Sequence, residues 1–164
     1  MTETIIRPVR PTDKSAVITL GRELIKAGDT YAFDSQMTDE DLWHYWTVEK
    51  QAKAYVAEQD TVILGIFVIK QNQPGPAAHI ANASYAVSAH ARGKGIGRAM
   101  GQASLTIARD LGYHAMQFNI VIATNLAAIK LWQSLGFDII GTIPNGFCLP
   151  SGAYADFHIM HRAL

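Results

Sequence analysis

The chain has 164 residues, 49% of them apolar and 17% charged, a composition that indicates a folded globule and excludes a disordered or fibrous chain. Basic and acidic side chains number 14 each, so net charge gives no reason to expect nucleic acid or an anionic membrane as partner. The single cysteine, Cys148, excludes an internal disulfide and a cysteine-built metal site. The start lacks a signal-peptide pattern and no apolar run reaches membrane-spanning length, so we expect a cytoplasmic protein without a metal.

The chain opens with a predicted strand and a predicted helix. The strand covers residues 4–9. The helix follows a cap at Thr12 or Asp13, carries apolar side chains at helical spacing and ends near Gly28. Residues 29–37 follow no period and predict an irregular segment.

A second helix and a hairpin are predicted next. Thr38 begins a capping pattern for a helix that carries Trp43 and Trp46. Two β-rich runs, at residues 54–59 and 62–70, are separated by only two residues. That spacing predicts an antiparallel hairpin.

The second half alternates between β-rich and helical patterns. Strands are predicted at residues 80–87, 114–122, 137–143 and 154–160, and helices at residues 99–111 and 125–135. This order is neither regularly doubly wound nor segregated into strands and helices. It predicts one α/β (α+β) domain over residues 1–164, with a mixed, mostly antiparallel, twisted sheet and about four flanking helices. One parallel pair comes from the strand–helix–strand unit across residues 80–122.

The most informative motif is the run Arg92, Gly93, Lys94, Gly95, Ile96, Gly97 and Arg98. It joins a β-rich run to a helix, so a polyphosphate there would meet unpaired backbone N–H groups and the positive end of the helix dipole. The three glycines remove Cβ atoms from the path of phosphate oxygens and permit left-handed dihedrals. A tight strand-to-helix connection is the alternative interpretation. A Walker loop and a dinucleotide motif fit less well, because the first needs a Gly-Lys-Ser/Thr ending and the second an acidic residue about 20 positions on.

A second motif follows later in the chain: Asn125, a predicted helix that carries Trp132, and then Gly136-Phe137. Together the two motifs cover roughly residues 80–140 and resemble the Gcn5-related N-acetyltransferase superfamily. The resemblance implies acetyl-CoA as co-substrate, with its pyrophosphate at residues 92–98. It also implies acetyl transfer to the nitrogen of an amine.

Within that superfamily the chain is most similar to the fungal acetyltransferases that detoxify azetidine-2-carboxylate, and to their bacterial relatives. The shared stretches are Gly28-Asp-Thr-Tyr31, Ala81-Asn82, Asn119, Asn125 and Lys130-Leu-Trp132. This similarity implies a small amino-acid-like acceptor. Asp29, Tyr31 and Phe33 then lie on the acceptor-side loop, and Asn82 is a candidate partner for an acceptor carboxylate.

The expected reaction needs a polarised thioester carbonyl and a leaving sulfur. A backbone N–H near Val87 is the candidate donor to the carbonyl. Many superfamily members protonate the sulfur with a tyrosine at the position of Trp132, and an indole cannot act as a general acid. Asn119 and Asn125 are therefore predicted at the reacting centre, and Asn125 also belongs to the cofactor side. The structural alternatives are a helix N-cap for Asn125, a carbonyl partner within the sheet for Asn119 and a purely structural role for Asn82.

Several alternatives stay open at this point. Asp29, Asp34, His44 and His114 all have the chemistry of a general base, and none is assigned. A peptide acceptor and a non-catalytic acetyl-CoA sensor are the competing functions. A homodimer is also compatible with the sequence.

Overall fold

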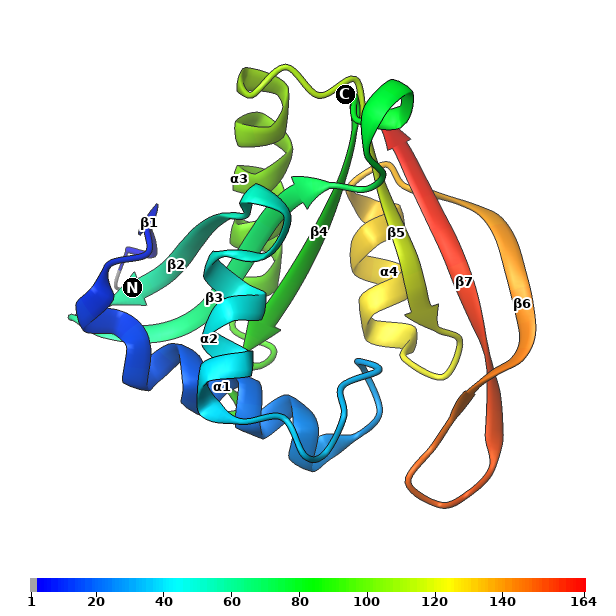
Figure 1. The fold of residues 1–164 in the computed structure, drawn as a ribbon, viewed down its shortest axis with the longest axis horizontal. Coiled ribbons are helices and arrows are strands. Elements are labelled where there is room, and N and C mark those ends of the chain that lie inside the picture. The colour runs from blue at the N-terminus through cyan, green and yellow to red at the C-terminus, as the bar shows by residue number, and fades with distance from the viewer. Residues whose placement is uncertain (1–2) are drawn as a thin grey trace.

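A seven-stranded sheet organises the structure, a computed structural model that describes residues 3–164 (Figure 1). The strands are β1 (Ile5–Pro8), β2 (Lys53–Gln59), β3 (Val62–Gln71), β4 (Ile80–Val87), β5 (Ala115–Ile122), β6 (Asp138–Cys148) and β7 (Tyr154–Ala163). Their order across the sheet is β1-β2-β3-β4-β5-β7-β6. Only the β4–β5 pair is parallel among these neighbours, which confirms the predicted mixed, mostly antiparallel sheet.

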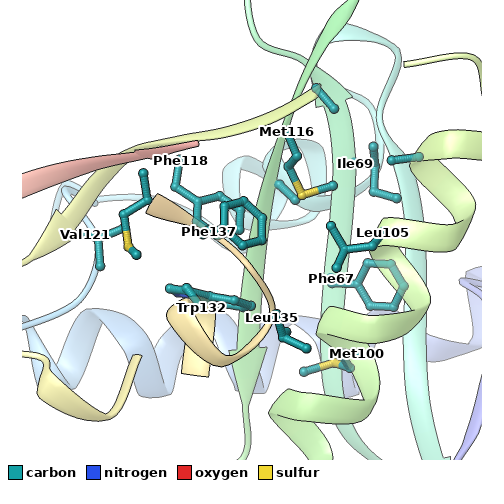
Figure 2. Close-up of a cluster of buried hydrophobic side chains, with 14 of the residues drawn as sticks. Phe67, Ile69, Met100, Leu105, Met116, Phe118, Val121, Trp132, Leu135 and Phe137 are labelled. Atoms are coloured by element: carbon teal, nitrogen blue, oxygen red, sulfur yellow. The ribbon is translucent and has the colours of Figure 1, made fainter. Parts of the chain in front are cut away.

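Four α-helices in the described chain cover the two faces of the sheet: α1 (Lys14–Ala27), α2 (Asp39–Thr47), α3 (Ile96–Asp110) and α4 (Leu126–Ser134). One face packs α1 and α2 on Val56, Ile66 and Val68. The other face carries α3 and α4, seen behind the sheet in Figure 1. The larger core lies on that second face, and Figure 2 shows its aromatic centre, where Trp132 and Phe137 gather around Phe118.

Helix ends follow the sequence signals closely, with one exception. Thr38 and Asp41 form the reciprocal capping box of α2. Gly28 and Gly136 end α1 and α4 with positive φ angles of 63° and 84°, as a helix-terminating glycine should. The expected cap of α1 is different: Asp13 makes no side-chain cap to that helix. Its carboxylate instead accepts the backbone N–H of Arg10 at 2.7 Å, inside a short 3-10 turn.

The last hairpin is longer than predicted. The predicted strand at residues 137–143 ends just before Pro144. In the structure β6 continues to Cys148, and its pairing with β7 shifts register between Ile143 and Phe147. Proline and a bulge are tolerated on an edge strand, where one side of the backbone has no partner strand.

The joint between β4 and β5 positions the site. Its parallel register contains only Ile80–Ala115 and Ala81–Met116, and beyond these pairs the two strands diverge. On the other side of β5, the register with β7 shifts between Phe118 and Val121. Asn119 and Ile120 therefore form a bulge at the divergence of the two strands.

Candidate active site

A cleft of about 650 Å³ opens where β4 and β5 diverge. Its walls come from the loop after α1, the second halves of β4 and β5, and the start of α4. The predicted acceptor-side residues Asp29, Tyr31, Phe33 and Asn82 all line it. The structure thus brings together segments that lie about 50 residues apart in the sequence.

The other predicted residues divide into two groups. Val87, Arg92, Asn119 and Asn125 line the same cleft. Residues 93–98 do not line it and form the adjacent loop and first turn of α3. The two predicted regions are therefore contiguous, with Arg92 at their junction.

Tyr31 takes the place of a strand partner for β4. Hydrogen bonds to β3 alternate along β4, as the bonds Asn72 N–H to Ile80 O and Ser88 N–H to Leu64 O show, so Tyr85 directs its backbone groups to the open side. The Tyr31 hydroxyl accepts the Tyr85 N–H at 2.7 Å and donates to the Tyr85 carbonyl at 2.9 Å. Burial raises the pKa of Tyr31 well above its ordinary value, so this hydroxyl stays neutral.

Val87 is the next β4 residue on the open side, by the same alternation. Its backbone N–H thereby points along the edge of β4 that borders the cleft. Val87 thus lines the cleft two residues beyond the backbone groups that Tyr31 occupies.

The acceptor side of the cleft is polar but largely uncharged. Asn82 donates its side-chain N–H to the Gln117 carbonyl at 2.9 Å, which ties β4 to β5 beyond their last backbone pair. Ser84 is buried, and its hydroxyl lies 2.8 Å from the Tyr45 hydroxyl. Burial raises the pKa of Tyr45 to about 12, so this pair is also neutral.

The buried side chain of Lys70 packs against Tyr45, one of the residues that line the cleft. The Lys70 Nζ lies 4.3 Å from the centre of the Tyr45 ring and 3.5 Å from a carboxylate oxygen of Glu49. Burial lowers the pKa of Lys70, and Glu49 opposes that shift. Neither Lys70 nor the Tyr45–Ser84 pair could be predicted from the sequence, because an isolated Lys in a strand and a Tyr in a helix carry no motif.

Asn125 combines a helix cap with a place in the cleft wall. It is the N-cap of α4, since its Oδ1 accepts the Ala128 N–H at 3.2 Å, and it lines the cleft. Asn119 is exposed, lies in the β5 bulge and makes no helix cap. Its side-chain amide contacts Gln117 and Asn72 instead of a backbone carbonyl.

The glycine loop presents open backbone to solvent at the start of α3. Gly93 and Gly95 have φ angles of 75° and 84°, and a Cβ at either would have no protein atom within 4 Å. Arg92 and Lys94 are exposed beside them. Open left-handed glycines, two cations and the first turn of a 15-residue helix can together receive a compact polyanion.

The remaining residues of the motif have packing contacts. Ile96 belongs to the core, so only its backbone can face a ligand. A Cβ on Gly97 would lie 3.4 Å from Leu131, which makes this glycine a contact between α3 and α4 and not only an opening for phosphate. Arg98 donates to the Ser134 hydroxyl at 2.9 Å across the same helix pair.

Trp132 lies between the core and the cleft. Only 8% of its surface is exposed, and its ring centre lies 4.7 Å from that of Tyr85 and 4.8 Å from that of Phe118. This aromatic packing gives Trp132 a structural role. No proton can pass through the indole at this position.

Within residues 3–164, no cluster of three or more His, Cys, Asp or Glu side chains has the geometry to hold a metal ion. None of the helices formed by these residues has the length and apolar character needed to cross a membrane.

Comparison with known proteins agrees with this geometry. Residues 20–137 match the Acetyltransferase (GNAT) family. N-acetyltransferase aca1 of Schizosaccharomyces pombe is 36% identical over 135 residues, which cover 73% of this chain and 64% of that protein. A GCN5-related N-acetyltransferase from Kribbella flavida has 43% identity and a TM-score of 0.94, with 98% of each chain covered. A phosphinothricin acetyltransferase from Sinorhizobium meliloti, solved in complex with acetyl-CoA, has the same fold at 21% identity and a TM-score of 0.89, with 100% of this chain and 89% of that chain covered.

The chain therefore belongs to the acetyltransferase (GNAT) family, a class of N-acetyltransferases for which acetyl-CoA is the co-substrate. It spans 64% of the length of the fission-yeast relative.

Proposed function

We propose that this protein transfers an acetyl group from acetyl-CoA to the amine of a small amino acid or imino acid. One observation carries the proposal. The cleft reaches Arg92, at the beginning of the open glycine loop, and leads to a chamber whose walls include neutral amides, hydroxyls and aromatic rings. A peptide acceptor would need a longer, open groove, and the acceptor side is bounded by Tyr31, Phe33 and Tyr45.

Acetyl-CoA would be held at two places. Its pyrophosphate suits residues 92–98, where Gly93 and Gly95 leave the backbone open and Arg92 and Lys94 add charge. Val87 and Asn125 border the cleft beyond that loop. When bound, acetyl-CoA supplies a thioester whose carbonyl carbon can accept an amine nitrogen. The Val87 N–H is the proposed donor to that carbonyl.

At the reacting centre this chain contributes hydrogen bonds instead of an ionised acid. Asn119 on β5 and Asn125 at the start of α4 lie on two walls of the cleft. Amides do not ionise near neutral pH, so their role is to orient the amine and to stabilise developing charge. Each such bond is worth on the order of 1–3 kcal/mol in a desolvated site.

The acceptor is assigned to the chamber on the α1–α2 side. Asn82 still has one side-chain N–H beyond the bond to Gln117, which suits an acceptor carboxylate. Tyr31 and Phe33, whose rings stack at 5.1 Å, offer an apolar wall to a small ring or aliphatic side chain. Asp29 lies at the rim, where an exposed carboxylate can attract a cationic amine. The resemblance to enzymes that act on azetidine-2-carboxylate favours imino acids among these acceptors.

The test measures thiol release from acetyl-CoA with a panel of amino acids, imino acids, polyamines and short peptides. We expect turnover with amino or imino acids and no thiol release without an acceptor. Turnover confined to peptides would overturn the acceptor class. Acetyl-CoA binding by calorimetry without turnover on any amine would instead indicate a sensor.

A further inference from the structure

A row of three side-chain amides crosses the acceptor side of the molecule. Gln117 donates its Nε2–H to the Asn119 Oδ1 at 2.9 Å. Asn119 in turn donates its Nδ2–H to the Asn72 Oδ1 at 2.7 Å. The first two residues belong to β5, and Asn72 directly follows β3, 47 residues earlier in the chain.

The direction of this row is set as a unit. A side-chain amide has two donors on nitrogen and an acceptor oxygen. Rotating Asn119 by 180° would place its oxygen against the Asn72 oxygen and its nitrogen against the Gln117 nitrogen. With Gln117 and Asn72 oriented as they are, only this orientation of the Asn119 amide forms both hydrogen bonds.

Asn72 is the rigid end of the row. Its side chain is 8% exposed, and its backbone N–H donates to the Ile80 carbonyl at 2.8 Å, which closes the turn between β3 and β4. Asn119, in contrast, is exposed and lies in the β5 bulge, outside the ladder with β7. An exposed bulge residue has many accessible rotamers, so a buried partner is needed to hold it in one.

We propose that Asn72 is a positioning residue that fixes the Asn119 amide toward the cleft. With one Nδ2 proton given to Asn72 and one Oδ1 lone pair given to Gln117, one N–H and one lone pair remain for a ligand. Asn72 itself does not line the cleft and acts through Asn119. The inference rests on the proposed function insofar as Asn119 acts on the acceptor.

The experiment compares two substitutions of Asn72 that match it in size. Asn72→Leu removes the acceptor oxygen, whereas Asn72→Asp keeps it. The first readout is the side-chain NH₂ signal of Asn119 in ¹H–¹⁵N NMR spectra, assigned with Asn119→Ala. We expect the signal to shift in Asn72→Leu and to keep a hydrogen-bonded proton in Asn72→Asp. An unchanged signal in Asn72→Leu overturns the proposal.

Kinetics provide the second readout. We expect Asn72→Leu to lower kcat/KM for the acceptor about tenfold, Asn72→Asp to stay within about threefold of the wild type, and the calorimetric Kd for acetyl-CoA to be unchanged in both. In an Asn119→Ala background, Asn72→Leu should have no further effect. An equal loss in Asn72→Leu and Asn72→Asp would overturn the proposal, since it would indicate a general packing role. If urea titrations show that Asn72→Leu is not folded, Asn72→Ala replaces it in the comparison.

The two hypotheses can fail separately. If Asn119→Ala turns over acceptors at the wild-type rate, the proposed role of Asn119 fails even when the NMR shift is seen. If Asn119→Ala is impaired and the NMR signal does not depend on Asn72, the proposed function stands and the positioning role fails.

Discussion

Most individual residues that line the cleft contribute hydrogen-bonding groups that carry no charge. Tyr31, Tyr45 and Ser84 keep neutral hydroxyls, and Asn82 and Asn119 present amides. Such a surface can orient an amine without holding it as a cation, and acetyl transfer requires the neutral amine. Asp29 at the rim is the carboxylate that the acceptor would meet first.

The first residue-scale prediction concerns the two asparagines of the proposed reacting centre. Asn119→Ala should lower kcat/KM by about tenfold to a few hundredfold, because one decade corresponds to about 1.36 kcal/mol. Asn125→Ala should have a similar effect and also destabilise the fold by roughly 1 kcal/mol, since the cap on Ala128 is lost. Steady-state kinetics at matched folded fraction separate these effects. Wild-type turnover of every acceptor by Asn119→Ala would end this assignment.

The second residue-scale prediction concerns Trp132. Because the ring packs between Tyr85 and Phe118, Trp132→Phe should keep kcat within about fivefold while it lowers the free energy of unfolding by roughly 1–2 kcal/mol. Steady-state kinetics and urea denaturation on the same preparation give kcat and the free energy of unfolding. A loss of several hundredfold in kcat with an intact fold would contradict a packing role.

At the level of elements, the glycines of α3 and of the loop before it are of two kinds, which the sequence motif alone cannot distinguish. Gly93 and Gly95 are left-handed and open to solvent, which suits a ligand. Gly97 and Gly101 are helical and face α4, where a Cβ on Gly101 would lie 2.6 Å from Leu135. The spacing in the sequence predicts the loop correctly, but only the position of α4 distinguishes helix packing from phosphate binding.

A matched pair of glycines tests the element-scale prediction. Gly95 and Gly112 lie at the two ends of α3 with φ angles of 84° and 87°, and a Cβ at either has no neighbour within 4 Å. Alanine at either should therefore cost about 1–2 kcal/mol of stability. Only Gly95→Ala should also weaken acetyl-CoA binding, by at least about tenfold in calorimetry. Equal affinities for the two variants would refute the proposed pyrophosphate site.

The whole molecule is held at its N-terminal edge by an ion-pair network. Arg7 on β1 donates to Asp13 at 2.7 Å and to Glu58 on β2 at 2.8 Å, which ties the start of the chain to the sheet. The Arg7 guanidinium beside Asp13 holds the pKa of that carboxyl below its ordinary value. A depressed pKa in the folded state contributes stability above the unfolded value, about 3.9, and this is lost as pH falls through the folded pKa.

Asp13→Asn should accordingly lower the free energy of unfolding by about 2–3 kcal/mol at pH 7. Its difference from the wild type should begin to shrink below about pH 4, where the unfolded carboxyl takes up a proton, and should disappear only below the depressed folded pKa, where the folded carboxyl is protonated as well. Urea titrations at pH 7, 5 and 3.5 provide the comparison. If the difference in stability between Asp13→Asn and the wild type does not change with pH, the substitution acts through the shape of the side chain and not through its charge.

At this scale the sequence predicted the class of sheet, its parallel pair and most element ends, since hydrophobic period and glycine caps are local signals. It missed the extension of β6, where Pro144-Asn145-Gly146 resembles a turn but lies on a bulged edge. Likewise, local patterns cannot predict the bond from Asn82 to the Gln117 carbonyl or the bond from Asn119 to Asn72, because these partners lie 35 and 47 residues away in the chain. Most of the predicted site residues therefore gather around one cleft, but their mutual contacts could not be predicted.

The short joint between β4 and β5 has a consequence for how the molecule opens. Only two registered pairs join β4 to β5, and so connect β1–β4 with β5–β7. The aromatic contacts of Trp132 and Phe118 with Tyr85 span the same boundary. Side-chain packing, and not the hydrogen-bond ladder, thus carries much of the cooperativity between the two halves. A transient loosening of α4 would expose the amides of β5 to deuterium while β2 and β3 stay protected, so native-state exchange should reveal two units of different stability in one continuous sheet.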